Sequence, residues 1–206
     1  MTLDNLIAQG EHQQQDFKYV ISSVSKIAHS LSAFANTDGG RLLVGVRDNG
    51  RVAGVQSDEE IYMIDAAARS FCLPPVECQM QTTRHEGRSV LICTVEASSR
   101  RPVLAREEDG SQRAYVRVAD QNIVASPVQL ELWNQQQSGC ESILHEADCH
   151  WLSLFGRATE EGITLNRFCR LSHLPRRKAI RLLAQLLRFG LLQMRFDGQQ
   201  WRFQGS

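Results

Sequence analysis

The chain has 206 residues, of which 42% are hydrophobic and 22% charged, and its formal net charge is zero. This is the composition of an ordinary globular protein with one large domain or two small ones, and it excludes a disordered chain. No apolar run approaches the roughly 18 residues that cross a bilayer. The N-terminus does not have the pattern of a secretory signal, and the six cysteines are scattered, so we expect a cytoplasmic protein with reduced thiols and no membrane partner.

The first 55 residues predict a strand, a long helix and a hairpin. Residues 16–18 alternate between polar and apolar side chains, as a strand does. Apolar residues at three- and four-residue steps predict a helix over residues 20–36. Gly39-Gly40 should stop this helix, because glycine tolerates the left-handed conformation that closes a last turn. A buried strand over residues 42–46 follows, and the turn Asp48-Asn49-Gly50 would return residues 51–55 as its partner strand.

A long ordered motif runs through this part of the chain. It consists of Glu11, Asp16-Phe17-Lys18, Ala33-Phe34-Ala35-Asn36-Thr37, Gly39-Gly40, Gly45-Val46, Asp48 and Gly54. With this motif the chain resembles the Schlafen AlbA_2 family, which occurs in many bacterial proteins described as transcriptional regulators and in the nuclease core of animal Schlafen proteins. The resemblance covers about the first two-thirds of the chain and implies an α/β fold there.

The resemblance also implies a candidate metal site. In nuclease members of the family, three carboxylates at the matching positions bind the divalent metal used to cut RNA; here these are Glu11, Asp16 and Asp48. Asp16 is one methylene shorter than the usual glutamate, and metal geometry is sensitive to such a change. Asp16 could instead pair with Lys18, and Asp48 is also the expected first residue of its turn. A ribonuclease that uses Mg²⁺ or Mn²⁺ is therefore our alternative hypothesis, and no cofactor is expected otherwise.

The middle of the chain completes the first predicted domain. Ser57 and Glu60 have the spacing of a capping box, which predicts a helix that ends before Pro74-Pro75. Strands are predicted over residues 76–80, 90–95 and 114–118, and a helix over residues 127–137. The polar segment 135–139 is the predicted linker, so the first domain is expected at residues 1–138.

The last segment predicts a different architecture. Helices are expected over residues 143–156, 164–169 and 175–190, and a hairpin over residues 191–204. A helix, a helix–turn–helix and a hairpin make up the plan of a winged-helix domain, which we expect at residues 141–206. The predicted fold class is thus α+β, with an AlbA_2/Schlafen-like α/β domain followed by a small winged-helix domain.

Opposite charges separate along the chain. Residues 1–150 carry 13 Lys and Arg against 20 Asp and Glu, whereas residues 151–206 carry 10 against 3. A uniformly solvated surface does not predict this separation, but two modules with different partners do. The predicted nucleic-acid contacts are Arg176, Arg177, Lys178 and Arg181 at the start of the last helix, Arg188 and Arg195 beside them, and Lys18, Arg47 and Arg117 in the first domain.

The sequence therefore predicts a nucleic-acid-binding protein, specifically a DNA-binding transcriptional regulator that reads DNA with its C-terminal winged helix. RNA is the alternative partner. The first domain would serve assembly or make a second nucleic-acid contact, and a homo-oligomer is compatible with this role.

Overall fold

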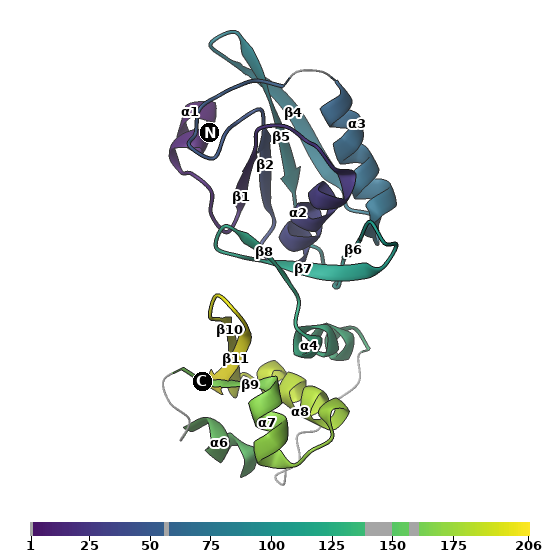
Figure 1. Cartoon of the computed structure of the whole chain (residues 1–206), viewed down its shortest axis with the longest axis vertical. Helices are drawn as coiled ribbons and strands as arrows, with labels where there is room; N and C mark the ends of the chain where they lie inside the picture. The colour runs from purple at the N-terminus through teal and green to yellow at the C-terminus, as the bar shows by residue number, and fades with distance from the viewer. Residues whose placement is uncertain (1, 56–57, 139–149, 157–160) are drawn as a thin grey trace. The chain divides into compact units, whose positions relative to one another are not determined.

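Figure 1 shows the computed structural model of the chain, which describes residues 2–55, 58–138, 150–156 and 161–206. The protein has a mixed α and β architecture and divides into two compact units, Met1–Ala125 and Ser126–Ser206. No helix in the described ranges combines the length and apolarity needed to cross a membrane.

In its described residues, the first unit has two sheets and three α-helices. Its elements are α1 (Leu3–Ala8), β1 (Gln15–Lys18), α2 (Val24–Asn36), β2 (Gly40–Val44), α3 (Glu59–Ala66) with a π-helical turn at Ala67–Phe71, β3 (Cys72–Leu73), β4 (Cys78–His85), β5 (Arg88–Val95), β6 (Leu104–Arg106), β7 (Gln112–Val118) and β8 (Gln121–Val124). One sheet has the strand order β1-β2-β5-β4 and the other β3-β6-β7-β8. Within the first sheet β1 is parallel to β2, and the other pairs are antiparallel.

Helix α2 is the central element of the first unit, as the periodicity predicts. It begins at Val24 rather than at residue 20, because the Ser23 hydroxyl caps it by accepting the Lys26 N–H at 3.4 Å. The helix packs against both sheets, in one core cluster with side chains such as Leu42 of β2 and Val103 before β6 (Figure 1). It ends at Asn36, and the backbone that follows turns sharply into β2.

Two glycines make this sharp turn. Gly39 has φ +71° and donates its N–H to the Phe34 carbonyl at 3.0 Å, so it occupies the left-handed region that glycine tolerates best. Gly40 passes the Phe34 ring so closely that a Cβ atom would lie 2.4 Å from its Cδ1. The predicted stop at Gly39-Gly40 is confirmed, and the packing of Phe34 adds a second reason for glycine.

The predicted hairpin is wrong in its extent. Only one bridge, between Val46 and Val52, joins the two segments, and β2 pairs with β1 and β5 instead. Gly45, with φ +92°, ends β2, and its carbonyl accepts the N–H groups of Ala53 and Gly54. Residues 51–55 therefore fold back over the end of the strand rather than running along it.

The second unit contains α4 (Pro127–Gln137), a 3₁₀ turn (His150–Leu152), α6 (Ser153–Gly156), β9 (Ile163–Thr164), α7 (Leu165–Ser172), α8 (Arg176–Arg188), β10 (Leu192–Phe196) and β11 (Trp201–Gly205). The strands form one antiparallel sheet in the order β10-β11-β9. Helix α7, a turn with left-handed His173, helix α8 and the β10–β11 hairpin follow one another in the predicted order. Ser57 of the predicted capping box and the first half of the predicted helix at 143–156 lie outside the described residues.

Helix α4 belongs to the second unit, although the sequence placed it in the first domain at residues 1–138. Val128 is fully buried in the core of the second unit, and the Gln135 side chain donates to the Arg181 carbonyl of α8 at 3.3 Å. Arg188 of α8 donates in return to the Gln135 carbonyl at 3.0 Å. Because these contacts all lie within residues 126–206, the compact units divide before Ser126 rather than at the polar segment.

Candidate nucleic-acid interface

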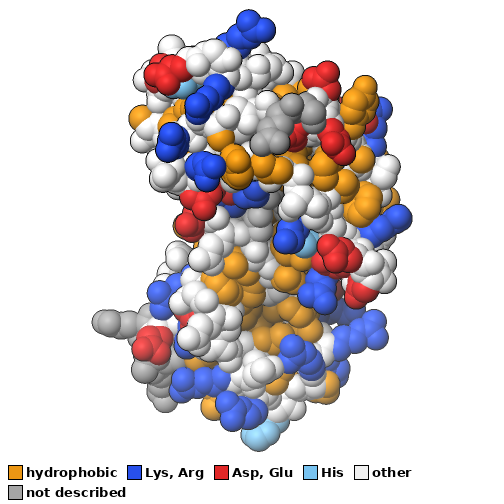
Figure 2. Space-filling model, turned by 45° about the horizontal axis from the view of Figure 1, so that its top comes forward, with side chains coloured by type: hydrophobic (Ala, Val, Ile, Leu, Met, Phe, Trp, Pro, Cys, Tyr) orange, Lys and Arg blue, Asp and Glu red, His pale blue; other side chains and the backbone are white. Residues whose placement is uncertain are grey.

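The first turns of α8 present a basic surface. Helix α8 buries Ala179, Leu182, Leu183, Ala184 and Leu186, so the side chains on its other face must point to solvent. The predicted residues Arg176, Arg177, Lys178 and Arg181 lie in the first two turns of the helix, and all four are exposed. Lys and Arg side chains are spread over the visible face of the second unit, with few acids among them (Figure 2).

The cations of α8 differ in how firmly they are held. The Arg176 Nη1 atom donates to the Asn166 side-chain oxygen of α7 at 2.6 Å. Arg177 and Lys178 have no side-chain partner within the described part of the chain. The Nε atom of Arg181 lies 3.8 Å from Glu131 of α4, a long and exposed ion pair that holds the guanidinium weakly. Arg176 is thus oriented by a neighbouring side chain, whereas Arg177 and Lys178 are unpaired among the described residues.

Arg188 and the hairpin arginines have structural contacts. Arg188 is half-buried and bonded to α4, so it joins two helices. Arg195 is exposed on β10, as expected for a phosphate contact. Arg202 is bound by Asp197 in the hairpin turn, and this hydrogen bond lowers the pKa of the Asp197 carboxyl well below its ordinary value.

Sequence reasoning missed Arg167 and Arg170 on α7. Both are exposed, and neither has a side-chain partner among the residues described. The signal was present in the sequence, because Leu165, Phe168 and Ser172 follow the three- and four-residue steps of a buried face. The two arginines fall on the opposite face and extend the basic surface from α8 onto α7.

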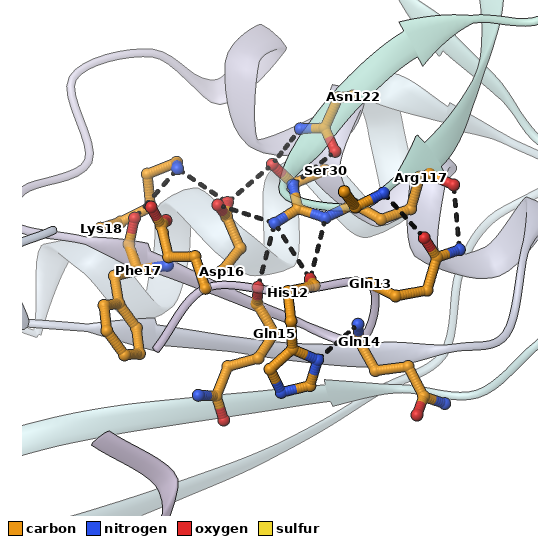
Figure 3. A network of polar contacts seen from close by, with 12 residues as sticks. His12, Gln13, Gln14, Gln15, Asp16, Phe17, Lys18, Ser30, Arg117 and Asn122 are labelled. Atoms are coloured by element: carbon orange, nitrogen blue, oxygen red, sulfur yellow. Dashed lines mark hydrogen bonds and ion pairs between the residues drawn. The ribbon is translucent and has the colours of Figure 1, made fainter. Parts of the chain in front are cut away.

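The prediction that Arg117 contacts nucleic acid is wrong. Its side chain is 1% exposed and lies between β7 and the segment before β1 (Figure 3). The guanidinium donates to the Gln15 carbonyl at 3.0 Å and to the Asn122 side chain at 2.9 Å, and its Nη2 lies 3.3 Å from Asp16 Oδ1. An arginine enclosed in this way cannot reach a phosphate, so Arg117 is a structural residue of the first unit.

The candidate carboxylates are also held by protein groups. Asp16 is buried, and its Oδ2 atom lies 2.7 Å from Lys18 Nζ and accepts the Ser30 hydroxyl at 3.4 Å (Figure 3). With Arg117 on its other oxygen, this carboxylate faces two cations. The Glu11 carboxylate accepts the Phe17 N–H at 2.9 Å, and burial, followed by the neighbouring Asp16, raises the pKa of Glu11.

The predicted triad of Glu11, Asp16 and Asp48 is not assembled. Asp48 lies on an exposed turn that is closed by hydrogen bonds between Arg47 and the backbone of Gly50 and Arg51. Among the residues that the structure describes, no group of three or more His, Cys, Asp or Glu is placed to hold a metal ion. The residues therefore do not fit a Mg²⁺ or Mn²⁺ ion, because two of the three acids are engaged elsewhere and the third lies apart.

A second polar group resembles a hydrolase triad but has the wrong geometry. Ser25 Oγ lies 3.5 Å from His29 Nε2, and Glu107 Oε2 lies 3.1 Å from the same nitrogen. A nucleophile and an orienting acid must contact different ring nitrogens. The Ser25 hydroxyl moreover donates to the Arg106 carbonyl at 3.0 Å, so this group stabilises α2 against the second sheet.

The solved structures that resemble the chain include the following two. The DIP2311 protein from Corynebacterium diphtheriae is 21% identical with a TM-score of 0.49, and the match covers 77% of this chain and 34% of that protein, so the chain spans about a third of its length. The N-terminal domain of a RecG-related protein from Nitrosomonas europaea is 20% identical with a TM-score of 0.42, over 70% of this chain and 92% of that domain. Neither likeness supports an argument about function, and no protein of curated function matches the sequence.

The model of the family described as Schlafen, AlbA_2 matches residues 11–126, more than half of the chain. The match begins at Glu11 and ends at the boundary between the two compact units, so it covers the first unit except for α1 and the segment after it. The resemblance inferred from the motif is confirmed, and the chain belongs to the Schlafen AlbA_2 family.

Proposed function

We propose that this protein is a DNA-binding transcriptional regulator that reads DNA with α7 and α8 of a C-terminal winged helix. The observation that carries the proposal is the exposed N-terminal turn of α8, where Arg177 and Lys178 have no side-chain partner among the described residues and Arg176 is oriented by Asn166. Reading helices contact base edges through their N-terminal residues. Membership of the Schlafen AlbA_2 family supports a nucleic-acid-related role in general.

The different restraint of these cations suggests different roles. A guanidinium that is held at one nitrogen keeps its Nε and Nη2 edge free for the two acceptors of guanine, so Arg176 is the expected base reader. Unrestrained side chains suit phosphates, which vary little in position from one sequence to the next. Arg177, Lys178 and the α7 residues Arg167 and Arg170 are therefore the expected phosphate contacts.

A salt titration tests the proposal. Binding of the full chain to random duplex DNA should weaken steeply with salt, with a log–log slope of about −0.9 for each phosphate contact. The double variant Arg177→Ala/Lys178→Ala should flatten that slope by about two units. The matched control, Arg84→Ala/Arg106→Ala, removes two exposed charges from the first unit and should leave the slope unchanged. Equal effects of both double variants would refute the assignment to α8.

The first unit would serve assembly or a second nucleic-acid contact. Lys18 keeps 34% of its side chain exposed even though its amino group pairs with Asp16, so it remains a candidate contact. A homo-oligomer would bring two reading helices onto one DNA, and sedimentation of the free protein measures this directly.

The alternative, a metal-dependent ribonuclease, is not favoured by the placement of its three acids. Incubation with transfer RNA and single-stranded DNA, with Mn²⁺ and with chelator, distinguishes the two functions. Cleavage that requires metal and is abolished by both Glu11→Ala and Asp48→Ala would establish the nuclease and overturn our preference.

A further inference from the structure

An exposed aromatic ring lies under an exposed cation just after β1. Tyr19 is 39% exposed, and the Arg47 guanidinium carbon lies 4.1 Å from the centre of its ring. On the face of the first unit shown in Figure 2, Lys and Arg side chains lie beside exposed hydrophobic ones. The pair belongs to neither the α8 surface nor the buried Arg117 network.

The turn after β2 holds Arg47 in this position. The Arg47 N–H donates to the Arg51 carbonyl at 3.0 Å, and the Gly50 N–H donates to the Arg47 carbonyl at 2.7 Å. No acidic side chain in the described ranges lies within ion-pair distance of Arg47 or Arg51, although Asp48 lies between them in sequence. The Tyr19 ring is thus the contact that orients the Arg47 guanidinium.

This arrangement favours a flat ligand that also carries negative charge. The Arg47 cation already occupies a face of the ring, so a second cation, such as a methylated lysine, would be repelled. A nucleobase can stack on both an aromatic ring and a planar guanidinium, and its phosphate can approach Arg51. Paired bases in a duplex hide their faces in the stack, so the ligand must be unpaired.

We propose that Tyr19 and Arg47 form a stacking platform for an unpaired base of single-stranded nucleic acid, with Arg51 beside the phosphate. The proposal deepens the second-contact role proposed for the first unit, but it does not require α8 to bind DNA. It assigns the two units to two states of nucleic acid, single strands at the first unit and duplex at the second.

The test compares binding of the full chain to a labelled single strand of about 12 nucleotides and to the corresponding duplex. Tyr19→Ala should weaken single-strand binding about five- to hundredfold at every salt concentration, because stacking is not ionic. Tyr19→Phe keeps the ring and should retain binding. Arg47→Ala removes the second stacking surface and should weaken binding as well. Arg51→Ala removes the proposed phosphate contact and should flatten the single-strand salt slope by about 0.7.

Matched controls make the result specific. Tyr62 on α3 is 74% exposed and has no ring or cation contact among the described residues, so Tyr62→Ala should leave single-strand binding unchanged. Arg106→Ala is the corresponding control for charge. If Tyr19→Ala binds single strands as well as the parent, or if Tyr62→Ala causes an equal loss, the platform is refuted.

A fluorescence measurement gives an independent readout. The three tryptophans are Trp133, Trp151 and Trp201, all in the second unit, so Tyr19→Trp places the only indole in the first unit. A base stacked on this indole should quench its emission, measured as the difference from the parent protein. If the Tyr19→Trp protein binds single strands without such quenching, the platform is refuted. If the parent chain binds single strands but not duplex, only the proposed role of α8 is refuted.

Discussion

Replacing Arg117 by Met tests how strongly the first unit depends on its buried ion pair. The substitution keeps an apolar chain of similar length next to Phe34, whose ring centre lies 5.3 Å from the guanidinium carbon. It removes one of the two cations that face Asp16, and it leaves the Asn122 side-chain oxygen without its donor. The Gln15 carbonyl loses one of its two donors and keeps the His12 N–H at 3.0 Å. Breaking one half of a buried pair typically costs about 3–5 kcal/mol.

The expected loss lies at the lower end of that range, about 3 kcal/mol, because Lys18 still pairs with Asp16 at 2.7 Å. The double variant Asp16→Asn/Arg117→Met removes the remaining buried charge and should recover part of the loss. The two groups are in direct contact, so their effects should not add, and the double-mutant cycle should give a coupling of about 1 kcal/mol or more.

The distribution of aromatic residues provides an internal control. All three tyrosines lie in the first unit and all three tryptophans in the second. In a thermal unfolding experiment Arg117→Met should lower the transition of the first unit, followed by the tyrosine signal, by about 10 °C. The transition followed by tryptophan emission should stay in place. A loss below about 1 kcal/mol, or an equal shift of both transitions, would refute the reasoning.

Three further predictions follow from individual contacts. Asn36→Leu removes a side-chain amide that donates to the Val103 and Tyr115 carbonyls, at 2.8 and 2.9 Å, and accepts the Val103 N–H at 2.8 Å. Urea denaturation should show that this variant loses about 2–4 kcal/mol of unfolding free energy, whereas Asn134→Leu, at an exposed position, should lose almost none. The pKa of Glu11 is raised above its ordinary 4.5 in the folded protein, so the unfolded chain releases this proton at lower pH than the folded chain does. The free energy of unfolding should therefore fall as pH rises through the window just above 4.5. Glu11→Gln should abolish this part of the pH dependence when unfolding is measured between about pH 4 and 7. Arg176→Ala should reduce discrimination at one guanine by about 1–3 kcal/mol in competition binding, whereas Arg177→Ala should weaken all sequences alike; the reverse pattern would contradict the proposed roles.

The local features of this protein can be predicted from its residues alone. The family motif, the buried face of α2 and the stop at Gly39-Gly40 were predictable, because each depends on residues within a few positions of one another. The cations at the start of α8 were also predictable, because they follow one another closely in the sequence. The separation of charge between the two ends of the chain can likewise be counted directly from the sequence.

The pairing of groups far apart in the chain, in contrast, becomes visible only in the folded protein. Asp16 and Arg117 are separated by about a hundred residues, and nothing in the local pattern of either indicates that they form one buried pair. A basic residue in an alternating strand fits a solvent face equally well, so Arg117 was predicted to be a surface contact. Helix α4 was assigned to the first domain for the same reason, since a helix with Val128 inward can pack on either neighbour in the chain. Burial and pairing depend on the surfaces that meet when the whole chain folds, and these surfaces are assembled from segments far apart in sequence.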